Sequence, residues 1–321
     1  MSRWPRLVIV AMFSLLGACT EDNPQKIMGQ PPGPYKMSLS IPQQIMAGKE
    51  VILTTEIKHS DTGLPVKNLR TLHDRRVHNF ITKLDFTNFS HIHHEDFNVL
   101  KVEQIESAKL SFPYTFPTPG QYRMVSEFTD AKRSWTKHFN IEVGRGAHTN
   151  DYPLEETNIS IVQNYTGTLS FVSQAPIAGV PIEMAVHIAR DNLPVSDLKL
   201  WLGSEAHVAI WRHDGKYFGH THSYTPAMKQ MMENLAHQKK SHANNSKMIQ
   251  DMMLRMMSQP SELIFKGPIV PVFYIFPEPG KYVMHFECAP NGKTIVFQFI
   301  VKVLPSVGIS STHEDSTHEI H

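Results

Sequence analysis

The sequence carries two histidine triplets with the same internal spacing. They are His78, His91 and His93 (the first triplet) and His207, His220 and His222 (the second triplet). In each triplet the second histidine follows the first by thirteen positions, and the third follows by two more. Neutral imidazole is the commonest metal-binding side chain, and three imidazoles with an open fourth position suit Zn(II) or Cu(II). Both triplets are therefore candidate metal ligands.

The triplets lie inside a tandem duplication. Leu64-Pro65-Val66 precedes the first triplet by the same interval as Leu193-Pro194-Val195 precedes the second. Downstream, Phe-Pro-x-Pro-Gly-x-Tyr occurs at 116–122 and again at 276–282. We place the first repeat at 36–143 and the second at 166–304, with a polar linker at 144–165.

The second triplet lies in a predicted β-hairpin. Asp214-Gly215 joins two apolar, aromatic-rich runs, and this dipeptide is a strong signal for a two-residue type I′ turn. With that turn, His207 stands directly opposite His222. Side chains alternate between faces, so His220 shares the face of His222. Opposed Cβ atoms lie about 4.5–5.5 Å apart and diagonal ones about 7–8 Å, so three imidazoles could bind one ion.

The first triplet is expected to form a weaker site. Its turn, at Asp85-Phe86, is a poorer type I′ signature, so the register is less certain. Glu205, two positions before the second triplet, shares its face and could be a fourth ligand or orient one. Near the equivalent point the first repeat has Arg76, which would repel a cation. Further candidate ligands in this repeat are His94 and Glu95.

The elements that position these residues are expected to be strands. Short runs of period-2 or apolar pattern alternate with turn residues, without a long helical period, which predicts an all-β fold of two tandem immunoglobulin-like β-sandwich domains. The strands expected in the first repeat are 36–41, 50–59, 77–84, 89–93, 109–115, 120–128 and 134–143. Those expected in the second are 167–173, 180–189, 205–213, 216–222, 269–275, 280–287 and 293–303.

The second repeat contains an insert at 223–260 that is unlike the rest of the chain. Its methionines are Met228, Met231, Met232, Met248, Met252, Met253, Met256 and Met257. They recur at helical spacing, which predicts two short helices forming a hairpin. The methionines could form its packed face as flexible gap fillers, or a thioether surface for Cu(I).

The chain begins with the pattern of an exported lipoprotein. Arg3 and Arg6 precede a short apolar run, which is typical of a signal peptide at 1–18. The ending Leu-Gly-Ala-Cys19 resembles the lipobox of bacterial lipoproteins, which implies lipidation of Cys19. In such proteins Thr20 after the cysteine implies the outer membrane rather than the inner, with the protein on the periplasmic side. The proline-rich stretch 19–35 is then a flexible tether and 305–321 a disordered tail.

Charge and cysteine content exclude some classes of function. The chain has 31 basic and 30 acidic side chains, and removing Arg3 and Arg6 with the signal leaves 29 against 30. Such a balance offers no electrostatic basis for binding nucleic acid. With Cys19 lipidated, Cys288 is the remaining thiol, so no intrachain disulfide can form; on a strand it is expected to be a buried apolar residue.

The second repeat resembles a domain of exported bacterial proteins. The resemblance is carried by Gly203-x2-Ala206-His207, by Asp214-Gly215-x2-Phe218-x-His220-x-His222 and by Phe276-Pro-x-Pro-Gly-x-Tyr282. Members of that family carry Gly-Ala-x-x-His-Leu-Val, then Phe-x-His-x-His, then Phe-Pro-x-Pro-Gly-x-Tyr. The resemblance covers most of the second repeat and, more weakly, the first. It implies an exported β-sandwich associated with the handling of copper or other heavy metals.

These patterns lead to one main hypothesis and two alternatives. The main hypothesis is a lipid-anchored periplasmic protein that binds copper or zinc, copper before zinc, for storage, delivery or resistance, alongside another envelope metal-handling protein. The first alternative is a non-catalytic envelope interaction or assembly module whose histidines are structural. The second is an enzyme, disfavoured because no Asp or Glu recurs as a candidate general base in both repeats and no nucleophile or dinucleotide motif is present.

Overall fold

The computed structural model describes residues 33–67, 69–130, 133–144, 154–172, 175–224 and 263–306. The signal peptide 1–18, Cys19 and nearly all of the tether 19–35 lie outside the described residues. So do the methionine-rich insert from 225 onwards and the tail from 307, so the predictions made for these segments stay predictions. Within the described ranges no helix is long and apolar enough to cross a membrane.

The first half of the structure, 33–144, consists of two antiparallel sheets. One has the order β1-β2-β5, formed by β1 (Tyr35–Ser40), β2 (Glu50–His59) and β5 (Lys109–Thr115). The other has the order β4-β3-β6-β7, formed by β4 (Ser90–Ile92), β3 (Val77–Lys83), β6 (Gly120–Thr129) and β7 (Ser134–Val143). A short 3-10 helix, η1 (His94–Asp96), and the helix α1 (Val102–Ser107) lie between β4 and β5.

The two sheets of the first half pack face to face as a β-sandwich. Leu53 of β2 and Phe112 of β5 belong to the same buried cluster as Ile81, Met124 and Ile141 of the facing sheet. Alternate residues of β5 are buried, as expected for a strand with one face on a core. The predicted all-β fold is therefore confirmed for the described residues.

The second half, 154–306, repeats this arrangement. One sheet has the order β11-β10-β9-β8 with β15 beside β10, and the other has β12-β16-β13-β14 with β17 beside β16. The strands of these two sheets are β8 (Ile159–Val162), β9 (Tyr165–Phe171), β10 (Pro181–Arg190), β11 (Leu193–Pro194), β12 (Leu198–Lys199), β13 (Ala206–Arg212), β14 (Phe218–His222), β15 (Ile269–Ile275), β16 (Gly280–Pro290) and β17 (Ile295–Val303). The strand β8 lies within the stretch whose polarity predicts a linker, and it pairs with β9. Cys288 of β16 is fully buried in this core, as expected.

The hairpin β13–β14 has the predicted register but a different turn. His207 pairs with His222, and Ala209 pairs with His220. A type I′ turn needs positive φ at both central residues, whereas only Gly215 of the Asp-Gly dipeptide has one, at 72°. Instead the loop spans 213–216, and the Asp214 carboxylate accepts the Lys216 N–H at 3.0 Å. The type I′ prediction is wrong, but the register survives because the wider loop adds one residue on each side of the dipeptide.

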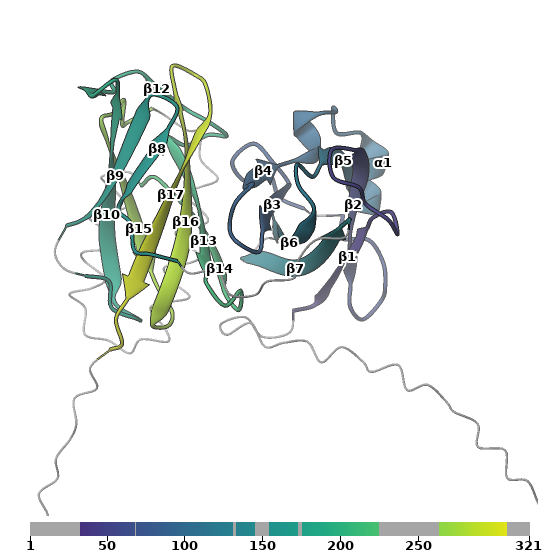
Figure 1. The fold of residues 1–321 in the computed structure, drawn as a ribbon. Helices are drawn as coiled ribbons and strands as arrows, with labels where there is room; N and C mark the ends of the chain where they lie inside the picture. Colours follow the sequence, from purple (N-terminus) through teal and green to yellow (C-terminus); the bar gives the residue numbers. More distant parts are fainter. Residues whose placement is uncertain are drawn as a thin grey trace, which may run out of the picture.

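The two halves pack against each other through the sheets that carry the triplets (Figure 1). A buried cluster joins Phe80 and Val125 of the first half to Trp211, Phe218 and Val283 of the second. In β3 and β13 all residues but the last are buried. These strands are covered on both faces, by the sandwich core on one side and by the other half on the opposite side. The histidines of both triplets consequently lie at an internal interface.

Candidate metal centre

The first triplet converges on one point. Nδ1 of His78 lies 3.1 Å from Nε2 of His91, and Nε2 of His93 lies 3.0 Å from each of these nitrogens. His78 comes from β3 and His91 from β4, while His93 immediately precedes η1. In a tetrahedral complex with metal–nitrogen bonds of 2.0–2.1 Å, the ligand nitrogens lie roughly 3.3 Å apart. The triplet is thus already at the spacing that a single ion requires.

The other nitrogen of each ring is bonded outside the triplet, and this sets the chemistry of the centre. The contacts are His78 Nε2 to the Leu72 carbonyl oxygen at 3.1 Å, His93 Nδ1 to Asp96 Oδ2 at 2.9 Å and His91 Nδ1 to Glu287 Oε2 at 2.8 Å. A neutral imidazole that donates from one nitrogen has a lone pair on the other. Three lone pairs therefore face one another, and a cation would satisfy all of them at once.

The imidazoles of the first triplet are held neutral. Burial lowers the pKa of His78 and of His91 well below its usual value, and the neighbouring His93 lowers both further. Burial also lowers the pKa of His93, against the opposing effect of Asp96. Metal ligation requires the unprotonated ring, so the environment keeps these side chains in the competent form.

Two glutamates hold the central histidine of each triplet from the opposite half. Glu287 of β16 accepts from His91, and Glu127 of β6 accepts from His220 Nδ1, both at 2.8 Å. Burial raises the pKa of Glu287 to about 8. The sequence analysis missed these two residues, although each glutamate follows the first residue of its Phe-Pro motif by eleven positions. That shared spacing is the signal that could have revealed the pair.

The second triplet is more loosely set than the first. Nδ1 of His207 lies 3.5 Å from Nε2 of His220, and His207 Nε2 donates to the Trp201 carbonyl oxygen at 2.9 Å. The ring centroid of His222 lies 4.5 Å from that of His207 and 4.3 Å from that of His220. The structure therefore brings together both predicted triplets, but the first is the tighter one. Asp96 accounts for this, because it anchors His93, whereas the bond from Glu287 to His91 is matched in the second triplet by the bond from Glu127 to His220.

A seventh histidine, missed by the sequence analysis, joins the second triplet. His73 belongs to the first half, yet its ring centroid lies 3.8 Å from that of His222 and 5.4 Å from that of His207. Ligand nitrogens of these three residues all lie within 4.8 Å of one another. Burial lowers the pKa of His73 to about 3. No spacing signal marks it, because the matching position of the second repeat is Leu202.

The other candidates from the sequence lie outside the two triplets' contacts. They bond instead as follows: Glu205 accepts from Ser223 and from the N–H groups of Ile264 and Phe265, His94 bonds the Ser111 backbone, and Glu95 accepts the Arg76 N–H. Arg76 itself donates to the Leu69 carbonyl oxygen. These four side chains tie loops to the sandwiches.

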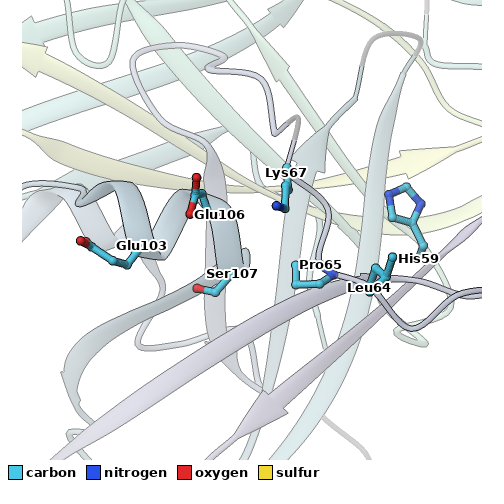
Figure 2. Close-up of a pocket in the computed structure, with 7 residues that line it drawn as sticks. All are labelled: His59, Leu64, Pro65, Lys67, Glu103, Glu106 and Ser107. Atoms are coloured by element: carbon cyan, nitrogen blue, oxygen red, sulfur yellow. The ribbon is translucent and has the colours of Figure 1, made fainter.

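The histidine centre is separate from the hollow shown in Figure 2. That hollow, of about 650 Å³, lies in the first half and is lined by His59, Leu64, Pro65, Lys67, Glu103, Glu106 and Ser107. Figure 2 shows acidic and basic side chains around it together with the apolar Leu64 and Pro65. None of its lining residues belongs to either triplet.

The chain matches one sequence family twice, at residues 31–145 and 160–304, and that family is described as a domain of unknown function (DUF8832). No curated protein matches the chain. Among solved structures, trypsin-activated alpha-2-macroglobulin from Escherichia coli is similar at 10% identity and a TM-score of 0.24, covering 87% of this chain and 17% of that one.

Two bacterial surface proteins show comparable similarity. The Escherichia coli adhesin FdeC is 9% identical with a TM-score of 0.22, covering 84% of this chain and 63% of that one. Invasin, a bacterial integrin-binding protein, is 9% identical with a TM-score of 0.21, covering 84% and 40%. This chain spans less than two thirds of each of these three structures. Similarity at this level carries no argument about function.

Proposed function

The chain belongs to the family described as a domain of unknown function (DUF8832), and we propose that it is a transition-metal-binding protein of the bacterial envelope. The primary site on this proposal is His78, His91 and His93, with the second triplet, His207, His220 and His222, as a further site. One observation carries the proposal: three imidazole nitrogens lie 3.0–3.1 Å apart while each ring bonds an outside group through its other nitrogen.

Copper is the preferred ion on this proposal, followed by zinc. The triplets offer imidazole nitrogen, and for a given nitrogen site the affinity for Cu(II) exceeds that for Zn(II). Asp96 and Glu287 do not compete as ligands in this scheme, because each bonds the far nitrogen of a histidine. Such carboxylate–histidine pairs fix the ring orientation and raise the basicity of the ligand.

The burial of the centre favours retention of the ion over catalysis. His78, His93 and His207 are each no more than 1% exposed. A hydrolytic metal site needs an open coordination position that substrate can reach. We therefore propose storage, delivery or resistance as the role, with transfer to another envelope metal-handling protein.

The proposal also covers the domain arrangement and the membrane location of the protein. Two tandem immunoglobulin-like domains would be anchored by a lipid on Cys19 to the outer membrane, facing the periplasm. The repeated family match supports the tandem arrangement, and the signal-like N-terminal sequence supports export and lipidation.

A second candidate function is a structural one. The bonds from His91 to Glu287 and from His220 to Glu127 cross between the halves. They favour an interaction module in which the histidines hold two sandwiches together for docking to an envelope partner. This candidate predicts no specific metal affinity.

Variants of two adjacent histidines, His93 and His94, distinguish the metal-binding function from the structural one. Titration of the mature protein with Cu(I), Cu(II) and Zn(II) should give a Kd below about 10 μM, equivalent to roughly 7 kcal/mol. His93→Ala should remove the ion held by the first triplet and so lower the number of bound ions by one. His94→Ala is the matched control, since His94 is also buried but bonds the Ser111 backbone instead of the triplet. Binding weaker than 10 μM in the unaltered protein would reject the metal proposal.

A further inference from the structure

We infer a second metal site that is built across the two halves, in which His73 of the first half joins His207, His220 and His222 of the second. The inference rests on the proposed function and deepens it. The site would take a divalent ion, Cu(II) or Zn(II), held by four imidazoles, and that ion would link the halves directly.

His73 is placed for this role by a tight turn. Leu72 and Arg75 pair through reciprocal backbone hydrogen bonds of 2.8 and 3.0 Å, and the two residues between them, His73 and Asp74, have φ of 46° and 63°. Positive φ at both central positions is the geometry of a type I′ turn, which is uncommon for residues other than glycine, asparagine and aspartate. The turn puts the His73 ring against the second triplet, stacked on His222 with centroids 3.8 Å apart.

The matching turn of the second half makes this site asymmetric. Trp201 and Ser204 pair in the same way, with Leu202 at φ 48° and Gly203 at φ 74° between them. Leucine thus stands where the first half has His73. The same turn supplies an imidazole from one half and an apolar side chain from the other.

The nitrogens of the second triplet are available to an ion. His207 donates to the Trp201 carbonyl through Nε2, and His220 bonds Glu127 through Nδ1, so their lone pairs meet 3.5 Å apart. Nε2 of His222 is buried and has no hydrogen-bond partner among the described residues. A buried polar atom without a partner is unfavourable unless something satisfies it.

Binding of an ion would bring the four ligand nitrogens closer together than they are in this structure. Ligand nitrogens of His73, His207 and His222 lie within 4.8 Å of one another, and Nε2 of His220 lies 3.5 Å from Nδ1 of His207, against roughly 3.3 Å in a tetrahedral complex. Four imidazoles without thiolate suit Cu(II) or Zn(II). The first triplet, in contrast, draws its three ligands from one half, with the second half contributing the Glu287 carboxylate that bonds His91.

The test uses native mass spectrometry of the full mature chain loaded with Cu(II) or Zn(II). We expect two ions in the unaltered protein, one in His73→Asn, one in His91→Ala, and two in the control His187→Ala, whose side chain is exposed on β10. Asparagine is chosen because it tolerates the left-handed backbone of this turn. His73→Leu is a second variant, since the chain itself has leucine in the matching turn.

A spectroscopic measurement of the ligands complements the count of bound ions. Pulsed electron paramagnetic resonance of the Cu(II) form should count four imidazole nitrogens on the second ion, and His73→Asn should abolish the signal of that ion. An unaltered protein with one ion that is lost in His91→Ala would overturn this inference and leave the proposed function standing. Two ions with unchanged spectra in both His73 variants would also overturn it. Failure of the unaltered protein to bind any ion would overturn both proposals.

Discussion

Nδ1 of His91 lies 2.8 Å from Oε2 of Glu287, although the two residues are 196 positions apart and belong to different halves of the chain. The reciprocal pair, His220 Nδ1 and Glu127 Oε2, has the same separation of 2.8 Å. Each half therefore orients the central histidine of the other half's triplet. The geometry of the candidate metal centre and the packing of the halves consequently depend on the same contacts.

Replacing Glu287 by glutamine should weaken metal binding without unfolding the protein. The amide oxygen can still accept from His91 Nδ1, but it lacks the negative charge that Glu287 carries above its pKa of about 8 and that increases the basicity of the ring, so the comparison is made at pH 9. Loss of such a supporting carboxylate typically lowers metal affinity roughly 10–100-fold. Competition titration against a chelator of known affinity measures the change. Glu103→Gln, on the exposed face of α1, is the control, and equal affinities in the two variants would contradict the assignment.

The metal-free protein should lose stability as the pH falls from about 6.5 to about 4. Burial lowers the pKa of His285 and of His138 to about 4, so the unfolded chain binds protons before the folded one does in this range. Each histidine contributes stability that is complete above pH 6.5 and falls by on the order of 3 kcal/mol by pH 4. His285 also donates to the Phe86 carbonyl oxygen of the other half at 3.0 Å.

Urea unfolding between pH 7 and pH 4.5 measures that dependence. His285→Gln should make the pH profile shallower while leaving the part due to His138, because the amide does not titrate in this range. His187→Gln, at an exposed position of β10, should keep the slope of the unaltered protein. A profile in His285→Gln as steep as that of the unaltered protein would show that this ring does not contribute.

Metal exchange should be slow and should speed up when the interface between the halves is loosened. The ring centroid of Phe218 lies 4.9 Å from that of Phe80 across the interface and 4.6 Å from that of Trp211. Phe218→Ala removes packing worth roughly 3–5 kcal/mol, so the buried centre should open more often. Transfer of bound ion to an excess of chelator, followed by absorbance, should be faster in this variant than in Phe97→Ala, whose side chain is 47% exposed. Identical rates would indicate that ions leave without separating the halves.

Metal should stabilise the unaltered protein but not a variant that lacks its ligands. At a free ion concentration 100 times the Kd, binding adds about 2.7 kcal/mol to the free energy of unfolding. Thermal melts of the unaltered protein and of a variant with His78→Ala and His207→Ala together, each with and without Cu(II), test this. Equal thermal shifts on adding metal would favour the purely structural role of the histidines.

Local features of the candidate centre could be predicted from the sequence. The position of the Asp214-Gly215 dipeptide and the alternation of side chains were enough to pair His207 with His222 and to put His220 on their face. The turn type was wrong, since Asp214 uses its side chain to cap the loop rather than adopting positive φ. The ranking of the triplets by geometry also differed, because Asp96, which anchors His93 of the first triplet, had not been identified.

The sequence by itself determined most of the strands, the hairpin register and the duplicated histidines, because period-2 alternation and turn chemistry act over a few neighbouring residues. The tertiary structure alone decided that Glu127 and Glu287 support the triplets of the opposite halves and that His73 reaches the second one. These contacts depend on how two sheet faces pack. No local spacing encodes that arrangement, since the partners lie 93 and 196 positions apart.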